Sequence, residues 1–119
     1  MSRCRSCRPV PEEVRRAADL LERRWLLSIL YASLEGAVRF NEFRQALADI
    51  PPATLSERLR RLEHAGILER RVLARSTPPV VEYRLTREGR DLAPVVEAVT
   101  RWTRGRPGIA AAQRDPVPD

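Results

Sequence analysis

Residues 41–64 read NEFRQALADIPPATLSERLRRLEH and decide the fold. Segments 42–48 and 53–64 each carry apolar residues at steps of three and four, which is the spacing of an amphipathic helix. Between them stands Pro51-Pro52, which forces a break because proline excludes the helical conformation from the residue before it. The stretch therefore predicts two short helices joined by a tight turn.

The ends of these two helices carry capping signals. Asn41 is a candidate N-cap for the first helix. The second helix begins either with Pro52 at its first position or with a capping box from Thr54 to Glu57, and the residues alone leave both open. Gly66 is expected to end it.

Beyond Gly66 the apolar period changes from helical to two. Segments 67–73 and 80–85 predict two β-strands, and residues 74–79 between them predict the tip of a hairpin. Two short helices followed by a hairpin make a winged helix-turn-helix. The predicted fold class is therefore mainly α with a small β-wing (α+β).

Helical patterns also flank the predicted helix-turn-helix. Residues 12–35 are apolar on two faces, and Glu22-Arg23-Arg24 is a candidate break within them. Residues 87–104 carry another apolar stripe, which Thr86 is expected to cap and Pro94 to kink. Because a helix that is apolar on two faces packs against more than one neighbour, residues 12–35 are a candidate dimerisation helix. Residues 87–104 are a second candidate, because their stripe adds apolar surface beyond what a small winged helix can cover.

The predicted domain covers residues 12–104. Residues 1–11 are expected to form a flexible basic arm, and residues 105–119 a disordered tail. No apolar stretch approaches the roughly 20 residues of a membrane span, and the basic start runs into prolines and glutamates rather than a secretion signal. We expect a cytoplasmic protein without a membrane partner.

The charge of the chain favours a polyanionic partner. Its 119 residues include 22 basic side chains, all arginine, against 16 acidic ones, which gives a net charge of +6. Residues 53–77 hold six Arg and three Glu, so they carry +3. Arginine binds phosphate through two parallel hydrogen bonds. The alternatives are a coding preference for Arg over Lys and a solvated helix face with Glu–Arg pairs.

The predicted DNA-binding residues fall into groups. The N-terminal half of the second helix is expected to reach base edges in a major groove about 12 Å wide, and the arginines of that helix to bind phosphates. The hairpin tip is expected to reach the minor groove or the backbone. The base-reading candidates are Thr54, Ser56 and Glu57, and the phosphate-binding candidates are Arg58, Arg60 and Arg61. The candidates at the hairpin tip are Arg75, Ser76 and Thr77. Two further candidates near the first helix are Arg39 and Asn41.

Few residues are present for catalytic or metal chemistry. His64 is the sole histidine, which makes a His-based triad or a His-rich metal centre hard to assemble. The five glycines stand apart, so the chain has no glycine-rich phosphate-binding loop. We expect a protein that is not an enzyme and that needs no cofactor and no metal.

The order of these motifs resembles the HxlR family of bacterial winged helix-turn-helix regulators, within the MarR-like superfamily. The resemblance covers residues 12–104 and rests on WLLSIL from Trp25, RFNEF from Arg39, LSERLRRLE from Leu55 and YRLTREG from Tyr83. It implies a homodimer built from the N-terminal and C-terminal helices. It also implies a pseudo-palindromic operator whose two half-sites lie about one DNA turn apart.

Apolar residues outside the helix-turn-helix point to the same dimer. Together they make more apolar surface than a winged helix of about 60 residues can cover, and exposed apolar patches mark interfaces. The candidate interface residues are Trp25, Ile29, Val95, Val99 and Trp102. Trp25 alternatively belongs to the core of its own chain.

The two cysteines form a Cys4-x-x-Cys7 pair among arginines. Neighbouring positive charge favours the reactive thiolate, so Cys7 and Cys4 are candidate redox sensors. The alternatives are an inert arm, control by a small-molecule effector, and a zinc site of four cysteines shared between two subunits. Several members of the resembled family sense oxidants through an N-terminal cysteine, whose position corresponds here to Pro11 or Glu12.

The sequence therefore predicts a DNA-binding transcriptional regulator. It is expected to bind its operator as a homodimer and to respond to a redox, electrophile or small-molecule signal. The alternative is a winged-helix module whose basic face binds an acidic protein, without operator-specific DNA binding.

Overall fold

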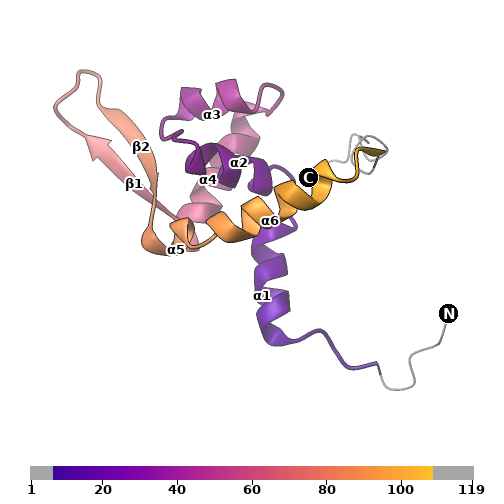
Figure 1. Cartoon of the computed structure of the whole chain (residues 1–119). Coiled ribbons are helices and arrows are strands. Elements are labelled where there is room, and N and C mark those ends of the chain that lie inside the picture. The colour runs from indigo at the N-terminus through magenta and orange to yellow at the C-terminus, as the bar shows by residue number, and fades with distance from the viewer. Residues whose placement is uncertain (1–6, 109–119) are drawn as a thin grey trace.

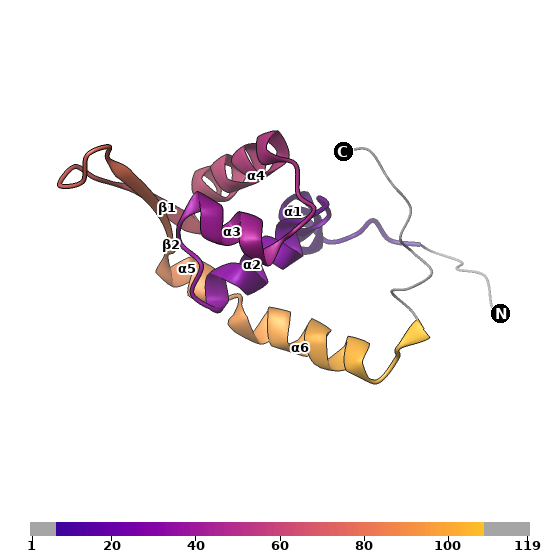
Figure 2. The same cartoon turned by 90° about the horizontal axis from the view of Figure 1, so that it is seen from above.

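The computed structural model describes residues 7–108. Three helices, α2, α3 and α4, pack together, α6 runs along one side of them, and a two-stranded hairpin projects away from them (Figure 1, Figure 2). The predicted class, mainly helical with a small antiparallel wing, is confirmed. In chain order the elements are α1 (Glu12–Leu21), α2 (Leu26–Leu34), α3 (Phe40–Ala46), α4 (Pro52–His64), β1 (Leu68–Leu73), β2 (Val80–Leu85), α5 (Arg87–Arg90) and α6 (Ala93–Arg104).

The core forms where α2, α3, α4 and β1 meet. In α4 the buried leucines follow each other at steps of four and three, so one stripe of the helix faces inward. Burying a leucine or phenylalanine side chain contributes about 1.5–3 kcal/mol, and these side chains account for most of the packing of this small domain. The largest fully buried side chains are Phe43, Leu26, Ile29, Leu30, Leu55, Leu59, Leu62 and Leu68.

Helix α3 begins one residue before the predicted cap. Arg39 is the N-cap residue, and Asn41 lies exposed in the first turn, so the expectation that Asn41 caps the helix was wrong. The carboxylate of Glu42 takes over this task, because it accepts hydrogen bonds from the backbone N–H groups of Val38 and Arg39, each at 2.9 Å. These hydrogen bonds, that from Val38 first, lower the pKa of Glu42.

The turn between α3 and α4 is held by two buried side chains, Leu47 and Ile50. Helix α4 then starts at Pro52, whose fixed φ suits a first helical position. Of the two starts that the sequence left open, the proline is therefore the one used. Thr54 lies inside the helix and makes no capping box.

The hairpin matches the two predicted strands to within one residue. The strands pair antiparallel, with Leu68 opposite Leu85 and Leu73 opposite Val80. The turn that enters β1 passes through Gly66 at φ +79°, a conformation that glycine adopts without a steric penalty. The N–H of Tyr83 donates to the carbonyl of Val38 at 2.7 Å, which ties β2 to the segment before α3.

The C-terminal helical segment is divided, which corrects the prediction of one kinked helix. Thr86 caps α5 as predicted, because its hydroxyl accepts from the N–H of Gly89 at 3.1 Å. Helix α5 ends at Arg90, and α6 starts anew at Ala93. Pro94 thus lies in the first turn of α6, where a missing N–H costs no hydrogen bond, and it does not kink a helix interior.

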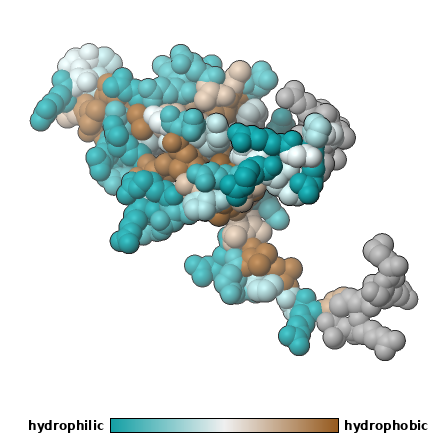
Figure 3. Space-filling view, in the orientation of Figure 1, coloured by the Kyte–Doolittle hydropathy of each residue, from teal (hydrophilic) through white to brown (hydrophobic). Residues whose placement is uncertain are grey.

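The break predicted at residues 22–24 is confirmed. Helix α1 ends at Leu21, and α2 is preceded by Trp25 in the left-handed region at φ +80°. This conformation is costly for a residue with a Cβ, so packing must stabilise it. Helix α1 buries none of its residues within the chain, and it projects from the body with hydrophobic side chains exposed (Figure 1, Figure 3).

The predicted terminal segments are covered only in part. Residues 7–11 are exposed and precede α1, whereas residues 1–6 of the predicted arm lie outside the described part. Residues 109–119 of the predicted tail lie outside it as well. Between residues 7 and 108, no helix is both long enough and apolar enough to span a membrane.

Candidate nucleic-acid interface

Helix α4 has one buried and one exposed face. Leu55, Leu59 and Leu62 have no exposed surface. Opposite them, five polar side chains that the sequence predicted for DNA contact point outward or lie at the flank. Ser56 and Arg60 are exposed, as is His64, and Thr54, Glu57 and Arg61 are half-buried.

Arg58 is buried, so the expectation that it binds phosphate was wrong. It is 4% exposed, and its Nε donates to the backbone carbonyl of Arg24 at 2.9 Å. The reason is visible in the spacing, because position 58 lies three residues after Leu55 and four before Leu62, on the buried stripe. The environment of this side chain is thus set by its place on the helix and not by its charge.

Glu57 links this buried arginine to the helix surface. Its Oε2 accepts from Nη1 of Arg58 at 2.6 Å, and its Oε1 from Nε of Arg61 at 3.4 Å. Partial burial acts to raise the pKa of Glu57, but the hydrogen bond from Arg58 and the charges of both arginines outweigh it and lower the pKa. Glu57 is therefore an anion whose oxygens already hold two arginines.

The other predicted contact residues lie at the start of α3 and at the hairpin tip. Arg39 and Asn41 are exposed beside α3. At the tip, Arg75 and Thr77 are exposed, and Ser76 is half-buried. The structure thus keeps these five side chains accessible, from two elements on either side of α4 in the sequence.

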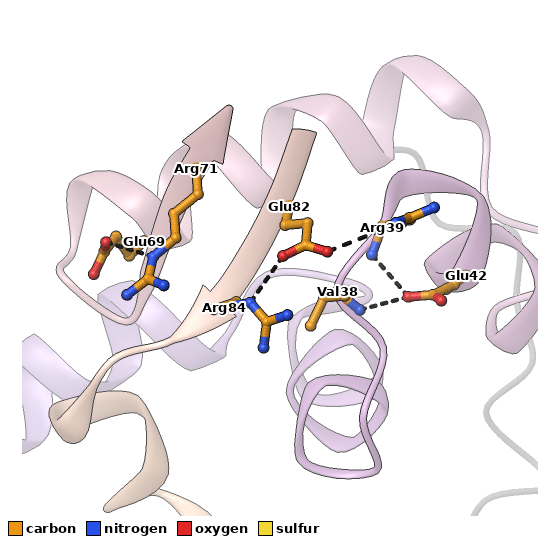
Figure 4. Close-up of polar contacts among 7 residues, drawn as sticks. All are labelled: Val38, Arg39, Glu42, Glu69, Arg71, Glu82 and Arg84. Carbon is orange, nitrogen blue, oxygen red and sulfur yellow. Dashed lines mark hydrogen bonds and ion pairs between the residues drawn. The ribbon is translucent and has the colours of Figure 1, made fainter. Parts of the chain in front are cut away.

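The hairpin carries an ordered set of charges that sequence reasoning missed. Glu82, only 7% exposed, accepts from Nε of Arg84 at 2.9 Å, and its second oxygen lies 3.8 Å from Nε of Arg39 (Figure 4). On β1, Arg71 donates to Glu69 at 2.8 Å. The period of two in β2 could have placed residues 82 and 84 on one face, but only tertiary packing brings Arg39 to them.

The described residues offer little for chemistry on a bound metal. Residues 7–108 hold no group of three or more His, Cys, Asp or Glu side chains that could bind a metal ion. Cys7 is exposed and disulfide-bonded, and Cys4 lies outside the described residues. What the arrangement presents is an exposed polar helix face with arginines around it, which suits a duplex of phosphates and bases.

The chain matches the HxlR-like helix-turn-helix family over residues 20–107. It belongs to this family. A curated relative in Bacillus subtilis, the HTH-type transcriptional regulator YvaP, is 39% identical over 87 residues, which are 73% of this chain and 80% of that protein. Other curated relatives in Mycobacterium are longer, and the chain spans 56% of their length. The HxlR-type chain described here is thus a helix-turn-helix transcriptional regulator.

Solved structures give the same assignment. The redox regulator HypR in its reduced form aligns with a TM-score of 0.76 at 34% identity, over 85% of this chain and 99% of that one. Diamide-treated YodB from Bacillus subtilis aligns with a TM-score of 0.67 at 33% identity, over 82% of this chain and 95% of that one.

The predicted interface residues of this HxlR-type chain separate into two classes. Ile29 is fully buried in the core of its own chain, so its assignment to a dimer interface was wrong. Trp25 is half-buried against the same core. The three residues of α6 stay accessible, with Val95 42%, Val99 39% and Trp102 49% exposed.

A groove of about 450 Å³ separates α2 from α6. Neither Trp25 nor Trp102 lines it. Its lining mixes apolar and charged side chains: Tyr31, Leu34, Glu35, Ala93, Val96, Glu97, Thr100, Arg101 and Arg104.

Proposed function

We propose that this regulator binds a pseudo-palindromic operator as a homodimer, with the exposed face of α4 in the major groove. The observation that carries the proposal is the division of α4: its leucines are fully buried, while Ser56 and Arg60 remain exposed between the α3 start and the hairpin. A helix held in this way presents side chains to base edges without losing its own packing.

Binding to duplex DNA tests the proposal first. If about five to eight phosphates are neutralised, the slope of log affinity against log salt is about −4 to −8. Arg60→Ala, which removes an exposed arginine, is expected to weaken binding to all sequences alike and to lower this slope by about 1. Ser56→Ala is expected to cost about 1 kcal/mol or more at the operator only. Equal loss on operator and mixed-sequence DNA in Ser56→Ala would contradict the assignment of the reading face.

The second candidate function is a winged-helix module that binds an acidic protein. The four Glu–Arg pairs on α4 and the hairpin favour it, because charges already paired within the chain attract a polyanion less strongly. Retention of sheared duplex DNA on the protein at near-physiological salt distinguishes the two. Salt-sensitive retention supports the regulator, and no retention at any salt supports the module.

The homodimer rests on two helices that find too little to pack against in one chain. Helix α1 buries no residue, although Val14, Ala18 and Leu21 follow helical spacing, and α6 buries only Val96 while Val99 and Trp102 stay exposed. Pairing these helices with those of a second copy would cover them. Val99→Asp is expected to convert the dimer to a monomer in sedimentation analysis. Arg101→Gln, which changes the net charge by the same amount on the opposite, exposed face of the helix, is the matched control.

A redox signal is the proposed input. Two structural relatives are regulators described in defined redox states, one reduced and one treated with diamide. In this chain Cys7 lies directly before the segment that leads into α1, so a change of its redox state would act on a proposed dimer helix. Operator binding is measured after reduction with dithiothreitol and again after diamide treatment, in the native chain and in Cys7→Ser. A response that is equal in both removes Cys7 as the sensor and favours a small-molecule effector.

A further inference from the structure

Glu82 joins two arginines from distant parts of the chain. Within residues 7–108 it is the one buried acidic side chain. One carboxylate oxygen accepts from Nε of Arg84 on the same strand, at 2.9 Å, and the other lies 3.8 Å from Nε of Arg39, which directly precedes α3 (Figure 4). A single carboxylate therefore fixes one arginine of the wing beside one of the helix-turn-helix.

Both arginines keep their outer donors accessible. The side chain of Arg39 is 52% exposed and that of Arg84 is 49% exposed. Each meets Glu82 through Nε, and the Nη groups of both make no hydrogen bond within the described part of the chain. A guanidinium offers five N–H donors in a planar fork, so two such groups on either side of one carboxylate leave outer donors that can approach the same phosphate.

The fold does not need this carboxylate to join the two segments. The N–H of Tyr83 already donates to the carbonyl of Val38 at 2.7 Å, and these two residues directly adjoin Glu82 and Arg39 in the sequence. Burying a carboxylate carries a large desolvation penalty, and a well-packed apolar side chain commonly stabilises such a position as well or better. The placement of a charge here is therefore better explained by what it holds than by packing.

We propose that Glu82 is a positioning residue for DNA binding, which holds Arg39 and Arg84 together as a clamp for one phosphate of the duplex backbone. The inference rests on the proposed function. In helix-turn-helix proteins the first helix of the motif crosses the backbone while the second reads the groove, and Arg39 stands at the start of that first helix, α3. Glu82 itself does not touch DNA.

Glu82→Gln separates positioning from simple electrostatics by the sign of its effect. Removing a negative charge near a polyanion tightens binding if only net charge matters. If Glu82 orients the two arginines, the same substitution weakens binding instead. The expected result on a mixed-sequence duplex of about 30 base pairs is a loss of about threefold to tenfold, with a salt slope reduced by about 1 to 2.

Glu69→Gln is the matched control. Glu69 lies directly opposite Arg84 in the hairpin, is exposed, and pairs with Arg71 on its own strand. Its removal changes the net charge by the same amount without releasing the clamp. Binding that stays equal or becomes tighter is expected, and a loss as large as that of Glu82→Gln overturns the proposal, because it would then reflect any carboxylate on the hairpin.

A second background shows whether Glu82 acts through the arginines. In Arg39→Gln/Arg84→Gln, introducing Glu82→Gln is expected to cause no further loss, since nothing remains to be positioned. A further loss of similar size assigns Glu82 to the fold and overturns the clamp. If thermal melting shows that Glu82→Gln is not folded, the single variants of the two exposed arginines test the clamp instead. Arg39→Gln and Arg84→Gln are each expected to lower the salt slope of DNA binding by about 1, and unchanged slopes refute the clamp.

Failure of the clamp is distinct from failure of DNA binding. A native chain that binds the duplex with a steep salt slope, but whose Glu82→Gln variant binds equally well, refutes the positioning role only. A native chain that does not bind the duplex at any salt refutes the proposed function, and the clamp with it.

Discussion

Replacing Arg58 should affect the fold of α4 rather than its phosphate contacts. Arg58→Ala removes a guanidinium whose Nε donates to the Arg24 carbonyl at 2.9 Å and whose Nη1 donates to Glu57 at 2.6 Å. The variant also removes most of the aliphatic stem of a side chain that is 4% exposed. The contact with Arg24 spans 34 residues and ties α4 to the junction of α1 and α2.

The magnitude follows from three contributions. Loss of buried methylene groups costs about 0.8 kcal/mol each, or about 2 kcal/mol in total. Loss of the charged hydrogen bond to Arg24 costs about 1.5–3 kcal/mol. Relief from holding a desolvated cation offsets part of this sum, and Glu57, which keeps Arg61 and is 41% exposed, can be rehydrated. A net loss of about 2–4 kcal/mol is expected.

Thermal unfolding followed by circular dichroism, at one fixed protomer concentration, measures this loss. For a domain of this size, about 3 kcal/mol corresponds to a fall in Tm of about 10–20 °C. Arg60 lies two residues further along α4, on its exposed face. Arg60→Ala is therefore the matched control and is expected to change stability by about 0.5 kcal/mol or less. If Arg58→Ala instead melts with the native chain and lowers the salt slope of DNA binding as Arg60→Ala does, its guanidinium reaches phosphate and the reasoning is wrong.

Three further predictions concern α5, α3 and the wing. Gly89→Ala places a Cβ 2.3 Å from the backbone oxygen of Ile67, so about 1–3 kcal/mol of stability should be lost in urea unfolding, whereas Gly108→Ala, with open space around it, should be neutral. Glu42→Gln should lower Tm at pH 7, because the hydrogen bonds that lower the pKa of Glu42 stabilise the fold at pH values above 4.5, the ordinary pKa of a glutamate. The difference in Tm between the variant and the native chain should vanish as the pH falls through the pKa of Glu42 in the folded state. A difference in Tm that stays constant down to about pH 3 would contradict this prediction. Arg75→Ala at the exposed hairpin tip should lower the salt slope of DNA binding by about 1 and leave discrimination between sequences intact; lost discrimination would show that the tip reads bases.

Local pattern predicted the elements but not every boundary. The leucine spacing of α4, the Pro51-Pro52 break and the period of two in the hairpin are short-range signals, and the corresponding elements form where they were expected. The two errors at helix ends have local causes as well. Glu42 outcompetes Asn41 as the capping group, and Pro94 starts a helix instead of bending one.

By itself the sequence determined which segments are helix, turn and wing, and the family motifs along them, because backbone preferences and apolar period act over a few residues. Only the tertiary structure decided which charged side chains are buried and which stay exposed. Arg58 is buried and donates to a backbone carbonyl 34 residues away, and Glu82 on β2 forms an ion pair with Arg39, which precedes α3. The free energy of a charge depends on what surrounds it in space, and neighbours along the chain do not fix that environment.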